Sequence, residues 1–317
     1  MTVKQSFDEF MRHGGTYWAP RTVKYYERNM TYFFRFLEME YHRPIDQILL
    51  EDLPEDILVN YVLWLRSRNR YSDHPFNDYI KASGTIKSNT VRTYVRAVKA
   101  YFNYLYDAGH LRCRFTEGLK VPKPDDDQII PLLQSEVDQI DAIFDPEIPN
   151  DLRNLCIVHL MLDAGLRSCE VIDLKPGDII FASSTIVINR SKGDKSRVVI
   201  MGDRLADLLR AYLEMFKPTA SLFRKTRSKE NIDETVMKFI FVRIRKATGI
   251  SRVHPHLLRH TFATSYIMGG GNLETLRILL GHFDYSVTRN YLHLATQYQI
   301  MKAPIYRLDP VFFEKGY

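Results

Sequence analysis

The chain has 317 residues, of which 45% are hydrophobic and 26% are charged, and this balance excludes a disordered or membrane-embedded chain. No apolar run is long enough to cross a bilayer, and the N-terminal MTVKQSFDEF has no signal-peptide pattern, so we expect a cytoplasmic protein. The three cysteines are scattered along the chain, so we expect no disulfide framework. A net charge of +6 points weakly to a polyanionic partner, because many basic proteins bind nothing acidic.

The first 121 residues are expected to be helical. In residues 88–109, Val91, Val95 and Val98 recur at helical spacing, and Gly109 is a typical helix stop. Further helices are predicted after Pro20 and at 55–68. Basic residues flank these apolar stripes: Lys24, Arg28, Arg92, Arg96 and Lys99. They form either an ordinary solvated face or a surface that contacts DNA phosphates, and both interpretations stay open.

The segment VPKPDDD, residues 121–127, is typical of a linker, which we place at 122–131. After it, STIVINRSKGDKSRVVIM alternates on both sides of a Gly-Asp turn and predicts a β-hairpin. Helices are predicted at about 134–144, 150–164, 204–216, 234–248, 256–268, 273–280 and 286–295. The predicted fold class is therefore mainly α with a small β-hairpin or sheet.

The stretch HPHLLRH, residues 254–260, brings three histidines and an arginine to the start of a predicted helix. His256, Arg259 and His260 would share one helix face. Two histidines suit zinc, but the arginine would repel a dication and no HExxH glutamate is present, so we expect no metal. An anion site fits better, because arginine offers a fork of donors and a helix N-terminus attracts negative charge.

Three more segments agree with an anion site. LDAGLRSCEVIDL contains Arg167 and Glu170, RSKGDKSR places Lys192 at the hairpin turn, and LLGHFDYSVTRNYLHLA contains His282 and Tyr291. Taken alone, each has an ordinary explanation, such as a surface ion pair or a turn lysine. The residue types by themselves therefore leave the site open.

The segments GLRSCE, SKGDKSR, HPHLLRHTFAT and LLGH with a tyrosine nine residues on resemble the catalytic signature of the tyrosine recombinases, the phage integrase family, in its Xer- and integrase-like form. The resemblance covers about residues 132–295. Its departures are small: Ser191 stands where many relatives have glycine, and Asn290 occupies a variable position. It implies a two-domain architecture forming a C-shaped clamp on DNA, with a helical, SAM-like core-binding domain at 1–121 and an α+β catalytic domain at 132–298.

The resemblance also implies how the phosphate is held. Arg167 and Arg259 would clamp the non-bridging oxygens of a scissile DNA phosphate. His256 and His282 would hydrogen-bond the phosphate or assist proton transfer. Glu170 would orient Arg167 or His256. Such preorganised cations stabilise the charge of the transition state without a metal.

The same resemblance assigns the covalent step. Tyr291 would attack the phosphorus and form a 3′-phosphotyrosine, while Lys192 would protonate the 5′-oxygen leaving group. A phenol with a pKa of about 10 is a weak nucleophile and needs a cationic pocket or a base. The ester would keep the energy of the broken bond, so no ATP or other cofactor is expected. His260 has no direct role in this scheme, and we expect it to pack within the domain.

The implied function is site-specific recombination of duplex DNA, in integration, excision, inversion or resolution. The implied assembly is a homotetramer on two sites, or a hetero-oligomer with a related recombinase. The apolar tail at 299–317 would dock on a neighbouring protomer or pack on its own domain. Two alternatives stay open: a type IB topoisomerase, and a DNA-binding protein of the same fold that has lost the reaction.

Overall fold

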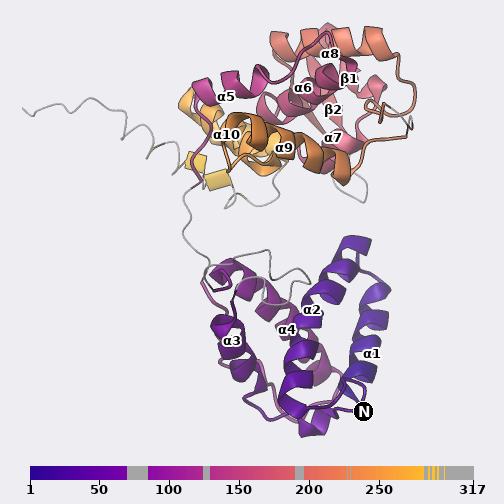
Figure 1. The fold of residues 1–317 in the computed structure, drawn as a ribbon, viewed down its shortest axis with the longest axis vertical. Coiled ribbons are helices and arrows are strands. Elements are labelled where there is room, and N and C mark those ends of the chain that lie inside the picture. The colour runs from indigo at the N-terminus through magenta and orange to yellow at the C-terminus, as the bar shows by residue number, and fades with distance from the viewer. Residues whose placement is uncertain are drawn as a thin grey trace, which may run out of the picture. The chain divides into compact units, whose positions relative to one another are not determined.

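The computed structural model describes residues 1–69, 85–123, 129–189, 196–226, 228, 230–281, 285, 288, 289, 291, 292 and 296. The chain divides into two compact units, Met1–Asp127 and Gln128–Tyr317. This division falls within the segment predicted as a linker. The described residues are mainly helical with one small sheet, which confirms the predicted fold class (Figure 1).

The N-terminal unit is built from four α-helices in its described part: α1 (Val3–Gly15), α2 (Pro20–Tyr41), α3 (Ile57–Ser67) and α4 (Ser88–Asp107), with a short 3₁₀ turn, η1 (Leu50–Asp52). Helix α4 contacts the other three (Figure 1). The three helices predicted in this half are confirmed.

Helix α1 was not predicted, although its sequence carries a start signal. The Thr2 hydroxyl accepts a hydrogen bond from the Gln5 backbone N–H, and the Gln5 side chain accepts one from the Thr2 N–H. This reciprocal capping box is followed by Phe7 and Phe10, both of which are buried.

The core of this unit follows from the apolar stripe of α4. Val91, Val95, Val98 and Phe102 are almost completely buried. The ring of Phe102 packs edge-on against that of Phe33 of α2, with 5.6 Å between the ring centroids. Burial of one such side chain stabilises the fold by about 1.5–3 kcal/mol. Gly109 follows the helix with φ +78°, a conformation that glycine adopts without strain.

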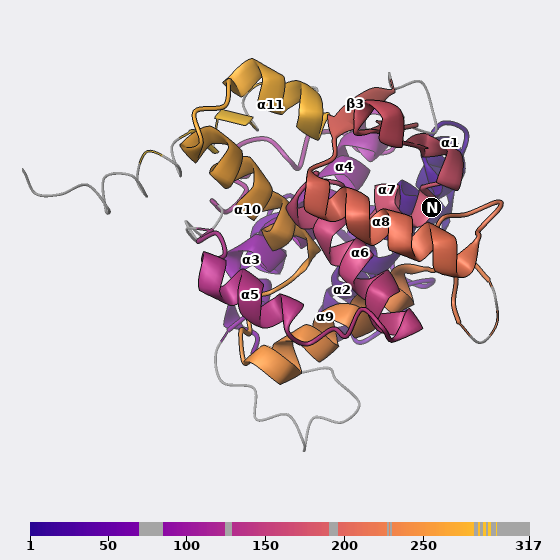
Figure 2. The ribbon, with the colours of Figure 1, turned by 90° about the horizontal axis from the view of Figure 1, so that it is seen from above.

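The second unit is arranged around one buried helix. From Asp151 to Leu162, every residue of α6 (Pro149–Leu162) is buried. It lies between α8 (Asp203–Phe216) and α10 (Pro255–Met268), and Figure 2 shows α8 crossing it. The remaining helices of the described part are α5 (Gln134–Asp141), α7 (Ser168–Asp173), α9 (Glu234–Thr248) and α11 (Leu273–Leu280), with 3₁₀ turns η3 (Pro176–Asp178) and η4 (Phe181–Ser183).

The sheet confirms the predicted hairpin and adds a strand. Strands β2 (Thr185–Ile188) and β3 (Arg197–Ile200) pair antiparallel, with Ile188 opposite Arg197. The short strand β1 (Ile179–Ile180) pairs with the other side of β2. Ile186, Ile188 and Val199 are buried, and Arg197 shares the buried face of β3 with Val199. The turn at 190–195 lies outside the described residues.

The last predicted helix, 286–295, is described only in part. Residues 288, 289, 291 and 292 are helical, whereas the others of this segment and the tail 299–317 lie outside the described residues. Helix α7 was not predicted, because it spans less than two turns. In the part of the chain that the structure describes, no helix combines the length and apolar character needed to span a membrane.

Candidate active site

Arg259 joins the ends of two helices. It is 5% exposed in the first turns of α10, where its guanidinium donates to the Gly165 carbonyl at 2.5 Å and to the Leu280 carbonyl at 2.6 Å. Gly165 follows α6 with φ +67°, and a Cβ there would lie 2.5 Å from the ring of Phe262. Only glycine therefore allows the turn that presents this carbonyl to Arg259.

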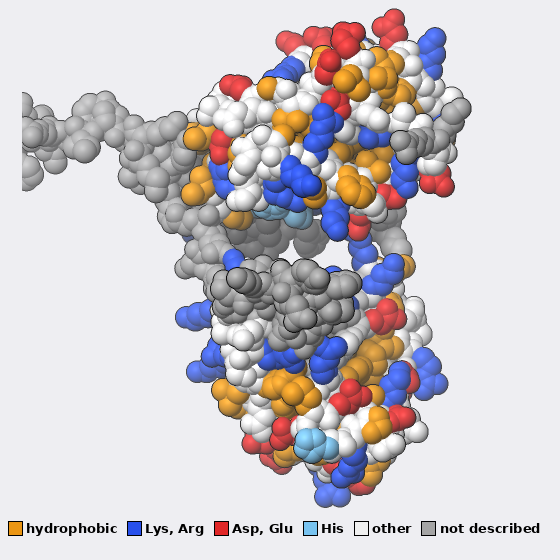
Figure 3. Space-filling model, viewed as in Figure 1, with side chains coloured by type: hydrophobic (Ala, Val, Ile, Leu, Met, Phe, Trp, Pro, Cys, Tyr) orange, Lys and Arg blue, Asp and Glu red, His pale blue; other side chains and the backbone are white. Residues whose placement is uncertain are grey.

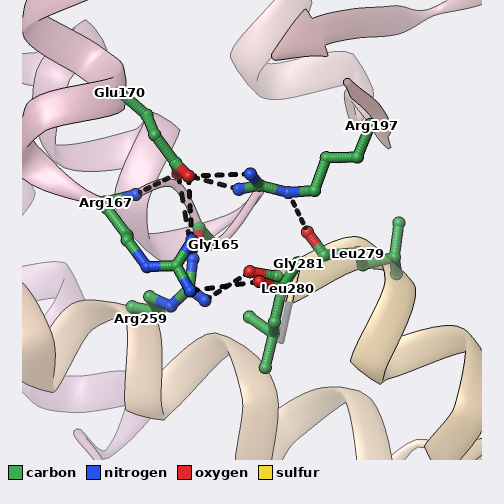
Figure 4. A network of polar contacts seen from close by, with 8 residues as sticks. All are labelled: Gly165, Arg167, Glu170, Arg197, Arg259, Leu279, Leu280 and Gly281. Atoms are coloured by element: carbon green, nitrogen blue, oxygen red, sulfur yellow. Dashed lines mark hydrogen bonds and ion pairs between the residues drawn. The ribbon is translucent and has the colours of Figure 1, made fainter. Parts of the chain in front are cut away.

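Arg167 stands beside Arg259 at the N-terminal cap of α7 (Figure 4). Its backbone N–H donates to Glu170 Oε2 at 2.7 Å, and its guanidinium donates to Glu170 Oε1 at 2.9 Å and to the Gly281 carbonyl at 3.4 Å. The Arg167 side chain is 29% exposed, so it is the more open of the two arginines. The structure thus brings together the two arginines that the sequence predicted as a clamp.

A third arginine, Arg197, completes the cluster. Its two terminal nitrogens donate to the two oxygens of Glu170, each at 2.7 Å, and its Nε donates to the Leu279 carbonyl at 2.7 Å (Figure 4). Glu170 also lies 3.9 Å from the Arg259 guanidinium. One carboxylate therefore balances three guanidinium groups, and the excess positive charge suits a phosphate.

No role was predicted for Arg197, which is the last residue of the segment RSKGDKSR. A signal was present: alternation along the strand places Arg197 on the same face as Val199 and Met201, both of which are buried. Glu170 is bonded to Arg167, one of the two residues that the resemblance implies it orients. That functional role itself stays a prediction.

The charge state of the cluster follows from its contacts. Burial would raise the pKa of Glu170, but the hydrogen bonds and charge of Arg197, followed by those of Arg167, hold that pKa at about 2. Burial and the neighbouring Arg167 lower the pKa of Arg259 to about 9. At neutral pH the carboxylate is therefore ionised and Arg259 protonated.

Tyr291 lies next to this cluster within the same chain. It is 4% exposed and packs with Ala263, Leu276 and Leu280. Burial raises the pKa of its hydroxyl, whereas the positive charges of Arg259 and Arg167 act to lower this pKa and offset part of the increase. The phenol is thus protonated at neutral pH, with two cations near enough to stabilise its anion.

The histidines of HPHLLRH differ in their surroundings. His254 caps α10 and its Nδ1 lies 2.6 Å from the Arg252 carbonyl oxygen. Desolvation, followed by the charges of His254, Arg259 and Arg167, lowers the pKa of the exposed His256. His260 packs its ring 5.2 Å from that of Tyr291, and burial lowers its pKa to about 4, so it is neutral.

Two predicted site residues, Lys192 and His282, lie outside the described residues. Among the residues that are described, no group of three or more His, Cys, Asp or Glu side chains is arranged to hold a metal ion.

The basic residues predicted to contact DNA are not all on one surface. Lys24 and Arg28 of α2 line a hollow of about 670 Å³ whose other wall includes Thr93 of α4. Lys99 instead donates to the Leu119 carbonyl at 3.0 Å and borders a different hollow. On the face shown in Figure 3, Lys and Arg side chains of this unit are interspersed with acidic ones.

The other two members of that set lie on α4. Arg96 is exposed. Burial raises the pKa of Tyr25, which lines the hollow of Lys24 and Arg28, and the positive charge of Arg96 acts to lower that pKa. The Nε of Arg92 is buried and has no hydrogen-bond partner among the described residues. The hollow therefore groups Lys24 and Arg28, and neither Arg92 nor Arg96 lines it.

Comparison with known proteins agrees with the motifs. The phage integrase family model matches residues 132–298. A tyrosine recombinase of Thermosipho africanus is 31% identical over 216 residues, which is 67% of this chain and 74% of the relative, and tyrosine recombinase XerC of Staphylococcus aureus is 29% identical over 287 residues, 88% of each chain. The Tn1549 transposon integrase, solved in complex with a circular intermediate DNA, has the same fold with a TM-score of 0.70 and 18% identity, over 96% of this chain and 100% of that one. The resemblance inferred from the motifs is confirmed: the chain belongs to the phage integrase family and is a tyrosine site-specific recombinase.

Proposed function

We propose that this recombinase cleaves and rejoins duplex DNA at a specific site through a 3′-phosphotyrosine formed by Tyr291. The observation that carries the proposal is the position of the buried Tyr291, which packs with Leu280, the residue whose carbonyl accepts a hydrogen bond from Arg259 in the same chain. A phosphate beside Arg259 and Arg167 would be open to attack by the phenol oxygen.

The proposed step forms one bond and breaks one. The Tyr291 oxygen bonds to phosphorus, the bond from phosphorus to the 5′-oxygen breaks, and Lys192 delivers a proton to that oxygen. The phenol proton passes to a base, for which His256 is the candidate because its lowered pKa keeps it unprotonated at neutral pH. Arg167 and Arg259 stabilise the negative charge on the non-bridging oxygens, with His282 as a further donor.

Rejoining reverses these events. The 5′-hydroxyl of a second strand attacks the phosphotyrosine and releases Tyr291, so the energy of the original ester is retained. The proposed reaction therefore uses neither ATP nor a metal, with the arginine cluster supplying the positive charge.

The proposed partner is duplex DNA, to which the related Tn1549 integrase is bound in its structure. We assign DNA contacts to both units, with 1–121 as core-binding domain and 132–298 as catalytic domain. Four protomers on two sites would exchange strands, as a homotetramer or with a related recombinase, and the tail 299–317 would dock on a neighbour or on its own domain. The protein would act on DNA in the cytoplasm, in integration, excision, inversion or resolution.

The test begins with the DNA site. The full chain is incubated with a random duplex library, adducts that survive denaturation are isolated, and their DNA is sequenced. A nicked duplex of the selected sequence then serves as substrate. Tyr291→Phe is expected to bind this duplex as wild type does and to form no adduct, whereas Tyr266→Phe, a matched change on α10, keeps the adduct.

Three other results would replace the proposal. An adduct formed by Tyr291→Phe would mean that another residue is the nucleophile. The absence of any wild-type adduct would favour a DNA-binding protein without the reaction. Relaxation of a supercoiled plasmid carrying one site, without strand exchange between two sites, would favour the topoisomerase alternative.

A further inference from the structure

Arg197 is a buried arginine that the reaction as described does not use. Its side chain is 5% exposed, and all three guanidinium nitrogens donate to the protein: two to Glu170 and one to the Leu279 carbonyl (Figure 4). An arginine so enclosed has its fork of donors committed to the carboxylate. Arg167, at 29% exposed, is far more open to a phosphate. Arg197 is therefore placed to act through other residues.

The bonds of Arg197 connect three segments of the site. It begins strand β3, five residues after Lys192 in the hairpin sequence. Through Glu170 it reaches the start of α7, where Arg167 is held. Through the Leu279 carbonyl it reaches the end of α11, after which the chain continues to Tyr291.

Glu170 depends on Arg197 for its charge balance. Among the described residues, three charged groups face this carboxylate: Arg197 from β3 at 2.7 Å, Arg167 from the cap of α7 at 2.9 Å and Arg259 from α10 at 3.9 Å. Of these three arginines, only Arg197 engages both oxygens with its side chain in a bidentate pair. Without it, a carboxylate that is 8% exposed would lose its bidentate side-chain partner, and the Arg167 guanidinium would lose a fixed acceptor.

We propose that Arg197 is a positioning residue, which holds Glu170 so that Arg167 and Arg259 converge on the phosphate and which fixes the base of the hairpin against the end of α11. This inference rests on the proposed function. It adds to that function a residue that touches no substrate atom but sets the geometry of those that do.

The test compares adduct formation by Arg197→Met, Arg197→Lys, Glu170→Gln and the Arg197→Met/Glu170→Gln double variant on the nicked duplex. Because misplacement by about 1 Å costs on the order of 100-fold in rate, we expect Arg197→Met to lose about that factor. Arg197→Lys should recover part of the rate, since lysine keeps the charge but lacks the fork. Arg210→Met removes an exposed arginine of α8 and should leave the rate unchanged.

Two readouts separate positioning from a general loss of structure. If Arg197 acts through Glu170, the double variant is no slower than the slower single variant, because the second change removes nothing further. The double variant also leaves no unpaired buried carboxylate, so it remains informative if Arg197→Met fails to fold. In Arg197→Met, burial of Glu170 is no longer opposed by Arg197, so the rate should fall on acidification at a higher pH than in wild type.

The outcomes are distinct. Formation of the wild-type adduct tests the proposed function, and the ratio of each variant to wild type tests Arg197. A folded Arg197→Met that reacts at the wild-type rate overturns the inference, as do effects of Arg197→Met and Glu170→Gln that multiply in the double variant, or a rate loss that is equal at every pH.

Discussion

Replacement of Glu170 by glutamine measures how strongly the arginine cluster stabilises the catalytic unit. The pKa of Glu170 is about 2 in the folded protein, against an ordinary value of 4.5, and the side chain is 8% exposed. That difference corresponds to a stabilisation of about 3 kcal/mol by the ionised carboxylate at neutral pH. Because the folded-state pKa is the lower one, the stabilisation is complete above about pH 4.5 and is lost as the pH falls toward about 2.

The assay is urea unfolding followed by two signals. Trp18 and Trp64 both lie in the N-terminal unit, so tryptophan fluorescence follows that unit, whereas far-UV circular dichroism follows both. We expect Glu170→Gln to lower the free energy of unfolding of the catalytic unit by about 3 kcal/mol at pH 7 and to leave the fluorescence transition unchanged. Asp207→Asn, at an exposed carboxylate of α8, is the matched control with no expected effect.

The pH dependence decides whether the reasoning holds. The gap between Glu170→Gln and wild type should narrow between pH 4.5 and 2, because wild-type Glu170 then becomes neutral as well. Equal unfolding midpoints at pH 7 would show that the carboxylate contributes nothing net. A gap that stays constant on acidification would show that shape, and not charge, is responsible.

Three further predictions concern other parts of the chain. Gly165→Ala should lower the free energy of unfolding of the catalytic unit by about 2–5 kcal/mol in urea, because the positive φ strains alanine and its Cβ would clash with Phe262. A decrease of less than about 1 kcal/mol would contradict the turn geometry. Burial lowers the pKa of His159, but its hydrogen bonds to the carboxylates of Asp141 and Asp163 outweigh that effect and raise the pKa to about 9. The stabilisation from protonated His159 is therefore present below about pH 6.5 and lost as the pH rises through 9. His159→Leu should remove this decline of the free energy of unfolding at alkaline pH, and an unaltered decline would assign it to another group. If Lys24 and Arg28 contact phosphates, the variant Lys24→Ala/Arg28→Ala should reduce the slope of log K against log salt for duplex binding by about 2, and an unchanged slope would return both residues to a solvated face.

Much of the secondary structure could be predicted from the sequence because it depends on local patterns. The helix predicted at 273–280 is observed as Leu273–Leu280, and the one predicted at 256–268 begins at Pro255. Apolar spacing and caps specify such elements over a few turns, whatever lies around them. The short helix α7 and the strand β1, which the sheet has in addition to the predicted hairpin, were missed because segments of six and two residues are too short to show a periodic pattern.

The candidate residues of the site could likewise be named from motifs, but their arrangement could not. Arg259 was predicted as part of a phosphate grip, yet only the folded chain shows its guanidinium bonded to the carbonyls of Gly165 and Leu280. These partners lie far from Arg259 in sequence, on the ends of other helices. Contacts of this kind depend on how helices pack, which no local pattern encodes.

Sequence alone determined the family, most of the longer helices, the hairpin, and the identities of the predicted nucleophile and its two arginines. The tertiary structure decided that Tyr291 is buried within reach of Arg259 and Arg167 in its own chain, and that Arg197 pairs with Glu170. The physical reason is that a buried carboxylate is stable only when paired with a cation, and the packing of distant segments decides which cation lies beside it. Here the alternation of β3 turned a hairpin arginine inward, where burial made its bond to Glu170 strong.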